Sequence, residues 1–325
     1  MEYLSENKID IILKYVELLC PNIRKTKYTA RYYLGHVMNV LNEFKTWKSL
    51  TKSDSIKKDK KYHYKTIADV YRLWCNNDVF VHAYDEIVHT DSNILNAEKQ
   101  IMDLLIDSTL IINKGGVEGI GYGSDSKKKK FTKLTMLSNR NGQNVAVVSH
   151  TSSPKMKMFT KPIYKFNINK IISLDDFKPI SPSTTTFNID KDIDVIKLLN
   201  ENGLTRTYKI KTLFHDIEGI ELVVDSLNKP EIKKEITGYK GYIINEAKIG
   251  KLKEKNVTII ASKRKNQNTV NTLTEKEKEK EKLKGRYKVE NMLCKIKVFQ
   301  RVHVRQDKKL KNYMGFVYLA CICKS

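Results

Sequence analysis

The sequence predicts an α/β protein in which a helical N-terminal region is followed by a mixed sheet flanked by helices. Two features of the sequence predict this class. Apolar residues recur at helical spacing through the first 95 or so residues, and from Gln100 they gather into short runs of strand length. A chain of 325 residues is long enough for two domains, which we expect at 1–95 and 96–325.

Four helices are expected in the first domain. Apolar side chains form a helical stripe that ends at Pro21, and three further stretches show the same spacing. Asn76 and Asn77 separate the last two helices, because asparagine tolerates the left-handed conformation that a tight helix–helix turn requires. The four expected helices cover 9–19, 28–47, 64–75 and 79–88.

The last two of these helices have the outline of a helix-turn-helix motif. In that motif the second helix enters the major groove of DNA, and His63, Lys65 and Arg72 would face phosphates. An ordinary helical hairpin with Trp74 in its core explains the same spacing equally well. Both interpretations stay open at this point.

The second domain begins with an apolar strand at 102–112, in which Asp107 is the one carboxylate that interrupts the buried side. Two more strands are joined at Asn141-Gly142, a dipeptide that predicts a two-residue hairpin turn. Residues 151–210 have uneven apolar spacing and a Ser-, Pro- and Thr-rich stretch, which predicts an insertion of loops and short elements. The two strands of this hairpin are expected at 131–137 and 144–149. The remaining strands and helices are expected at 217–227, 232–244, 257–261, 286–297 and 313–323.

Charge and composition indicate the class of partner. The chain holds 60 Lys and Arg against 37 Asp and Glu, a formal net charge of +23 that is spread along its length. Such a chain favours partners with many phosphates, because each neutralised phosphate releases counterions. Codon bias in an AT-rich genome is the alternative, but it would enrich Asn and Ile without so large a surplus of charge.

Cysteine usage and hydropathy indicate the compartment. The five cysteines are odd in number and scattered, and Cys321 and Cys323 are too close together for a zinc knuckle, so we expect reduced thiols. No charged and then apolar leader follows Met1, and no apolar run approaches membrane-spanning length. We therefore expect an intracellular protein at DNA or RNA, in the cytoplasm or nucleus, without a membrane partner.

Three charged residues fall on one face of the helix expected near the C-terminus. Arg286, Glu290 and Lys297 are spaced by four and seven residues, which at about 3.6 residues per turn places them on one stripe. An acid between two cations suits a phosphate and a divalent metal bound side by side. Taken singly, Glu290 could pair only with Arg286, and Asp107 could cap a turn at a strand end.

The order of these elements is that of a ribonuclease H-like (RNase H-like) domain, and several sequence blocks resemble one family with that fold. The family is the cut-and-paste insertion-sequence transposases of the insertion-sequence-4/5-like superfamily. Its helical DNA-binding region is also similar to the N-terminal piece around Trp47 and 64–84. The blocks are Asp107-Ser108-Thr109, Gly238-x-Lys240-Gly241-Tyr242, Ile259-Ile260-Ala261-x-Lys263-Arg264-Lys265-Asn266, Arg286-x-x-Val289-Glu290-x-x-x-x-x-x-Lys297, Phe299-Gln300-Arg301 and Arg305-Gln306-Asp307-Lys308.

The resemblance implies an RNase H-like transposase domain that cuts and joins double-stranded DNA, at the element ends and at the target. It implies two divalent ions, usually Mg²⁺ (or Mn²⁺), with Asp107 as the first metal-binding carboxylate and Glu290 as the last. Arg286 and Lys297 would hold phosphates beside the cut, and Lys240 is grouped with them as a DNA-binding residue. Whether the protein acts as a homodimer on the DNA is left open.

The sequence departs from the family pattern at two positions. Leu283 stands where a tyrosine usually precedes Arg286, and Tyr239 stands where the second metal-binding aspartate is expected. A phenol stays protonated at neutral pH and is a poor magnesium ligand.

No neighbouring acid is an obvious replacement for the expected aspartate. Asp216 and Asp225 belong to the preceding helix, whereas Glu235 shares the strand parity of Tyr239 and could point the same way. Two functions therefore stay open: a transposase that Tyr239 impairs, and a decayed or repurposed transposase that acts only as a DNA-binding protein.

Overall fold

The computed structural model of the chain forms two compact units, which are described separately. One comprises Met1–Ile120, Lys129–Thr151 and His215–Ser325, and the other comprises Gly121–Lys128 and Ser152–Phe214. The insertion expected at 151–210 overlaps the second unit. The residues that the structure describes are 4–21, 28–43, 46–52, 64–89, 101–122, 130–150, 156–160, 164–165, 178–179, 184–187, 205–208, 218–227, 231–239, 242, 246–261 and 283–325.

The N-terminal part of the first unit is helical, as the apolar spacing predicts. In α1 the buried residues Ile9, Ile12 and Val16 recur at helical spacing, and in α2 the Thr29 side chain caps the helix by accepting a hydrogen bond from the Tyr32 backbone N–H. The elements are α1 (Glu6–Leu19), α2 (Ala30–Asn42), the 3₁₀ helix η2 (Trp47–Lys52), α4 (Tyr64–Asn76) and α5 (Val79–His89).

Two details of this region differ from the prediction. The helix expected at 28–47 ends at Asn42, and the chain resumes as a 3₁₀ turn at Trp47. In the α4–α5 turn the left-handed residue is Asp78, with φ of 56°, and not one of the two asparagines. Aspartate, like asparagine, tolerates this conformation because its short polar side chain can bond locally.

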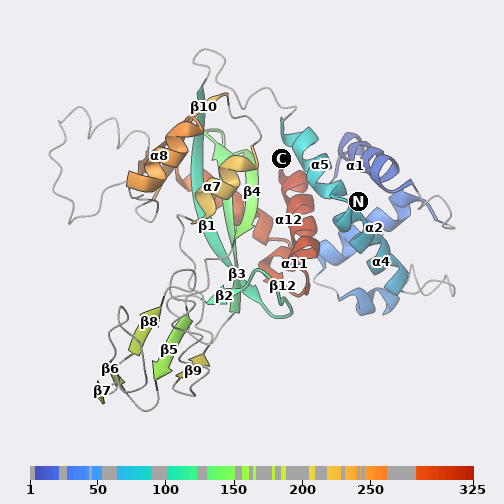
Figure 1. Cartoon of the computed structure of the whole chain (residues 1–325). Helices are drawn as coiled ribbons and strands as arrows, with labels where there is room; N and C mark the ends of the chain where they lie inside the picture. The colour runs from blue at the N-terminus through green and yellow to red at the C-terminus, as the bar shows by residue number, and fades with distance from the viewer. Residues whose placement is uncertain are drawn as a thin grey trace. The chain divides into compact units, whose positions relative to one another are not determined.

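The C-terminal helix α12 (Leu310–Lys324) packs against α4 and α5 on one side and strand β4 on another, as Figure 1 shows. The Tyr71 and Phe316 rings stack with centroids 4.4 Å apart, and the Tyr71 hydroxyl donates to the Asn312 carbonyl oxygen over 2.5 Å. Because apolar side chains cover nearly its whole circumference, α12 is buried almost all round. The final packed helix expected at 313–323 is therefore confirmed.

A mixed sheet forms the rest of the first unit, with the strand order β4-β3-β1-β10-β11. The pairs β4–β3 and β3–β1 are antiparallel, whereas β1–β10 and β10–β11 are parallel, and the short β12 pairs with the end of β1. The strands are β1 (Ile101–Asn113), β3 (Lys130–Asn139), β4 (Asn144–His150), β10 (Lys233–Gly238), β11 (Val257–Ala261) and β12 (Val304–Arg305).

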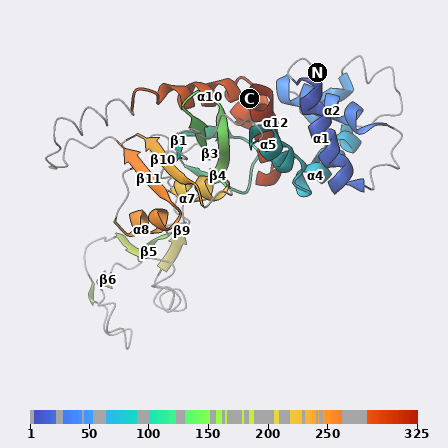
Figure 2. The ribbon, with the colours of Figure 1, turned by 90° about the horizontal axis from the view of Figure 1, so that it is seen from above.

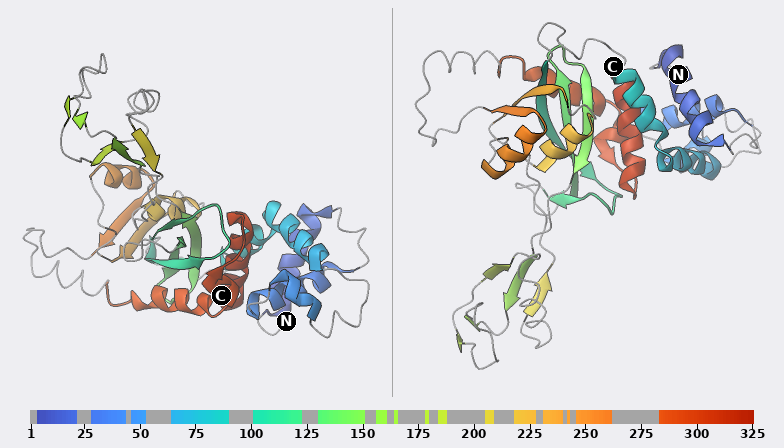
Figure 3. Two further views of the ribbon diagram at one scale, coloured as in Figure 1. Left: turned by 90° about the horizontal axis from the view of Figure 1, so that it is seen from below. Right: turned by 45° about the horizontal axis from the view of Figure 1, so that its top comes forward.

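Helices cover both faces of this sheet, so the predicted α/β class with a mixed, helix-flanked sheet is confirmed. Figure 2 and the left view of Figure 3 agree that α10 lies on one face and that α7 and α8 lie on the other. The short helix α11 follows α10. Their bounds are α7 (Glu218–Asp225), α8 (Glu246–Glu254), α10 (Tyr287–Lys297) and α11 (Gln300–His303).

The prediction of a two-residue turn at Asn141-Gly142 is wrong, because the loop of the β3–β4 hairpin is longer. The Gly142 N–H donates to the Asn139 carbonyl oxygen, and the Asn139 N–H donates to the Gln143 carbonyl oxygen, so the loop contains three residues. Gly142 is left-handed, with φ of +84°. This is a type I turn followed by a left-handed glycine, a geometry that needs one residue more than an Asn-Gly type I′ turn.

The strand expected at 232–244 ends earlier, at Gly238. A Cβ atom on Gly238 would lie 2.8 Å from both Ile106 Cγ2 and Tyr242 Cδ2, so only glycine lets the chain pass this close. The Tyr242 N–H then donates to the Tyr239 carbonyl oxygen over 2.9 Å, a turn-type hydrogen bond directly after the strand. Tyr239 is therefore the first residue after the strand.

A buried arginine ties the loop after β1 to the segment before α12. Arg305 is completely buried, and its guanidinium donates to the carbonyl oxygens of Glu118, Asp307 and Lys308 and to the Thr132 hydroxyl. These bonds satisfy the buried charge. The block Arg305-Gln306-Asp307-Lys308 thus has a structural role.

The described residues of the second unit are short strands. β5 lies between β8 and β9 in an antiparallel sheet, and β6 pairs with β7. The strands are β2 (Gly121–Tyr122), β5 (Met156–Thr160), β6 (Tyr164–Lys165), β7 (Lys178–Pro179), β8 (Thr184–Phe187) and β9 (Thr205–Tyr208). Across the described ranges of both units, every helix is too short or too polar to span a bilayer.

Candidate functional site

Asp107 lies in the middle of β1, on the face of the sheet that α10 covers. Side chains alternate along a strand, so Asp107 and Thr109 point to the same face, where the Lys297 ammonium donates to the Thr109 hydroxyl. Burial lowers the pKa of Lys297, and the nearby Asp107 carboxylate opposes this shift by favouring the charged amine. The structure therefore brings Asp107 and Lys297 together.

Tyr239 directly follows β10, the strand that pairs with the strand of Asp107. Thr237 of β10 pairs in parallel with Leu105 of β1, and the same register continued by two residues would place Tyr239 level with Asp107. Both residues share the parity of Thr237 and Leu105, so they lie on the face that α10 covers. The position beside the strand carboxylate is thus filled by a phenol.

Arg286 links Tyr239 to α10. Its guanidinium is ion-paired with Glu290, one helical turn further on, and its central carbon lies 4.8 Å from the centroid of the Tyr239 ring. A cation at this distance over an aromatic face is attracted by the negative face of the ring. Tyr239 is nevertheless 51% exposed, so much of its ring is open to solvent.

On the opposite face of the sheet, hydroxyl groups hold the Asp107-Ser108-Thr109 block. The Ser108 hydroxyl shares a hydrogen bond of 2.5 Å with the Tyr242 hydroxyl and one of 2.9 Å with the Thr135 hydroxyl. Tyr242 is almost fully buried, and the Ser108 N–H donates to the Asp107 carboxylate. Ser108 and Tyr242 therefore position the strand that carries Asp107.

The described residues do not fit the pair of divalent ions that the resemblance implies. Asp107 and Glu290 offer one carboxylate each, Glu290 is ion-paired with Arg286, and Tyr239 adds only a phenol. Within the ranges that the structure describes, no group of three or more His, Cys, Asp or Glu side chains could hold a metal ion. Mg²⁺ (or Mn²⁺) binding at Asp107 and Glu290 stays a prediction, which this donor set does not favour.

Neither of the two described neighbouring acids, Glu235 and Asp225, stands in for the expected aspartate. Glu235 does share the strand parity of Tyr239, but it pairs with Asp103, four residues or about 13 Å along β1 from Asp107. Asp225 lies on α7 and forms an ion pair of 2.6 Å with Lys255. Asp216 and Lys240 lie outside the described residues.

Arg140 is a residue of this region that the sequence did not single out. It stands at the tip of the β3–β4 hairpin, where its side chain reaches Asp103 at 2.9 Å and the Thr237 hydroxyl at 3.1 Å. Its carbonyl oxygen accepts a hydrogen bond of 2.5 Å from the Lys288 ammonium. Arg140 thus connects β1, β10 and α10. No local sequence pattern predicts that an arginine in a hairpin turn makes such contacts.

Of the residues predicted to face phosphates, Lys65 and Arg72 lie on α4, and His63 lies outside the described residues. Lys65 and Arg72 are exposed, and Arg72 pairs with Asp69 at 2.5 Å. Trp74 is fully buried, as expected for a helical hairpin, and α5 packs between α1 and α12. Because His82 is the only described residue of α5 that is classed as exposed, α4 is better placed than α5 to meet a phosphate backbone. The helix-turn-helix motif stays a prediction.

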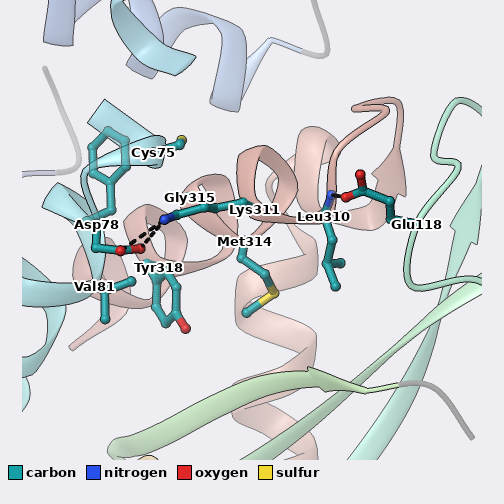
Figure 4. Close-up of a pocket in the computed structure, with 10 residues that line it drawn as sticks. Cys75, Asp78, Val81, Glu118, Leu310, Lys311, Met314, Gly315 and Tyr318 are labelled. Atoms are coloured by element: carbon teal, nitrogen blue, oxygen red, sulfur yellow. Dashed lines mark hydrogen bonds and ion pairs between the residues drawn. The ribbon is translucent and has the colours of Figure 1, made fainter. Parts of the chain in front are cut away.

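A separate hollow of about 450 Å³ opens beside the α4–α5 turn and α12 (Figure 4). The Lys311 ammonium meets the Asp78 carboxylate at its edge, and the Leu310 N–H donates to the Glu118 carboxylate. Burial raises the pKa of the lining thiol Cys75 far above its usual range, which makes it a poor nucleophile. None of the residues predicted from the sequence to act on DNA or metal lines this hollow.

Comparison of the chain with protein-family models, with curated proteins and with solved structures found no match.

Proposed function

We propose that this chain is a DNA-binding protein built on an RNase H-like, transposase-type domain whose metal-dependent cleavage is weak or lost. The strand order supports the fold, because an antiparallel three-strand meander followed by two parallel strands and a helix is the order expected of such a domain. The net charge of +23 supports a phosphate-rich partner.

The observation that carries the proposal is the pair of contacts that Arg286 makes, with the Tyr239 ring and with Glu290. In a working metal site these positions would supply two carboxylates to divalent ions. Here a cation lies between an acid and a phenol, so the local charge suits a DNA phosphate better than a metal. On this proposal an ancestral nuclease site has kept three of its side chains, Asp107, Arg286 and Lys297.

The test restores the missing acid. Purified chain is incubated with DNA and Mg²⁺ or Mn²⁺, and strand cleavage is followed for the unmodified protein and for Tyr239→Asp. We expect weak or absent cleavage by the first and a clear increase in the second, because a carboxylate beside Asp107 completes the donor set. Tyr239→Asn is the matched control, because asparagine has the size of aspartate without its charge, and this variant should stay inactive.

Two outcomes would contradict the proposal. Robust cleavage by the unmodified chain that Asp107→Ala abolishes would mean an active transposase, with another group in place of the aspartate. No gain from Tyr239→Asp in a folded protein would mean that Tyr239 does not occupy the position of the second acid.

A further inference from the structure

Tyr239 combines features that a core residue does not have. It is an aromatic side chain that is 51% exposed, directly after a buried strand, and its ring is held against a guanidinium. The backbone around it is fixed by the close passage of Gly238 and by the hydrogen bond from the Tyr242 N–H to the Tyr239 carbonyl oxygen. The ring is thus both accessible and preorganised.

The segment that contacts the ring from the α10 side is cationic, whereas Asp107 of β1 is an acid next to the position of Tyr239. The segment from Leu283 to Lys297 contains five Lys or Arg residues and one acid, Glu290, and that acid is already paired with Arg286. Cationic side chains beside an exposed aromatic ring are the elements of a surface that binds unpaired nucleic acid, where bases stack on the ring and phosphates meet the cations. Bases inside an intact duplex cannot present their faces in this way.

We propose that Tyr239, backed by Arg286, is a stacking site for an unpaired DNA base, so that the chain prefers DNA with a single-stranded or frayed end over fully paired duplex. The inference rests on the proposed DNA binding and names the form of DNA that this site takes. The guanidinium keeps the ring from rotating away, and the base covers the exposed part of the ring.

The test compares two DNA probes with the full-length chain. One is a blunt duplex, and the other is the same duplex with a short unpaired tail whose first base is a fluorescent adenine analogue. We expect tighter binding to the tailed probe and quenching of the analogue. Tyr239→Ala should weaken binding to the tailed probe by about 5- to 150-fold and weaken blunt-duplex binding much less, so that the preference for the tail is lost. Tyr239→Phe and Tyr239→Trp should retain the preference because they keep an aromatic face.

Tyr287 provides a matched control. It is also an exposed tyrosine, 56% accessible and next to Arg286 in sequence, so Tyr287→Ala removes a similar surface and should leave the tail preference intact. If Tyr239→Ala does not fold, Tyr239→Leu against Tyr239→Phe makes the same comparison between an aliphatic and an aromatic side chain.

Each negative result has a distinct meaning. Equal weakening of both probes by Tyr239→Ala, equal effects of the Tyr239 and Tyr287 variants, or equal binding of the two probes by the unmodified chain would overturn the stacking site alone. A chain that binds neither probe at low salt would overturn the proposed DNA binding as well.

Discussion

Arg286 has two neighbours of different chemistry, and both limit where its side chain can go. The Glu290 carboxylate holds it from within α10, and the Tyr239 ring holds it from the residue after β10. An aspartate at 239 would compete with Glu290 for the guanidinium or for a metal, whereas a tyrosine leaves the Arg286–Glu290 pair undisturbed. The residue at position 239 thus sets the local charge: an aspartate would add a further carboxylate to this face of the sheet, whereas a tyrosine adds no charge.

His36 makes folding stability depend on pH. It is buried on α2 beside the Tyr32 ring, and its Nδ1 atom has no hydrogen-bond partner. Burial disfavours the charged imidazolium and lowers the pKa of His36 below its usual 6.5. The unfolded chain therefore protonates His36 more readily than the folded chain does. The contribution of neutral His36 to the free energy of unfolding is complete above about pH 6.5 and is lost as the pH falls below that value.

We expect the free energy of unfolding, measured in urea, to fall from pH 7 towards pH 5 more steeply in the unmodified chain than in His36→Phe. The exposed His82 on α5 gives the matched control, because His82→Gln should keep the slope of the unmodified chain. A slope that His36→Phe leaves unchanged would mean that the acid sensitivity arises elsewhere.

At the scale of elements, α12 can lie against α4 and α5 because Gly315 has no side chain. A Cβ atom there would lie 2.6 Å from Cys75 Sγ and 2.8 Å from the Tyr71 hydroxyl oxygen. Gly250 on α8 is the contrasting case, since a Cβ atom there meets nothing within 4 Å. Alanine favours a helix over glycine by about 1 kcal/mol, and this gain is available at both positions.

We expect Gly315→Ala to lower the free energy of unfolding by about 1–3 kcal/mol, because overpacking outweighs the gain in helix propensity. Gly250→Ala should raise it by up to about 1 kcal/mol. Denaturant melts of the two variants provide the comparison. If both substitutions stabilise the protein, α12 does not pack as closely on α4 as the structure indicates.

The same contrast between local and long-range contacts explains which elements the sequence could predict. Apolar runs predict five elements, because an element with a buried face has apolar residues at regular spacing. These elements are β1, β3, β4, β11 and α12. The end of β10 at Gly238 depends on Ile106 and Tyr242, which are distant in sequence, and the hairpin loop depends on one left-handed glycine. The stripe of Arg286, Glu290 and Lys297 was readable from helical spacing, but the contacts of Arg286 with Tyr239 and of Arg140 with Asp103 cross between elements and leave no local pattern.

For the whole molecule, the excess of positive charge predicts that DNA binding depends strongly on salt. Each phosphate contact contributes a slope of about −0.9 to a plot of log affinity against log salt concentration, so a chain with several such contacts loses roughly a thousandfold or more between low and physiological salt. Affinity that does not change over this range would contradict an interface led by phosphate contacts.

The same measurement decides whether α4 touches DNA. If Lys65 and Arg72 each contact a phosphate, the double variant Lys65→Ala/Arg72→Ala should make the slope shallower by about 2. The matched control is Lys14→Ala/Arg31→Ala, which removes the same charge from exposed, ion-paired positions on α1 and α2. Because both variants change the net charge equally, a difference between their slopes reports contact and not overall charge. Equal slopes in the two variants would mean that Lys65 and Arg72 do not contact phosphates.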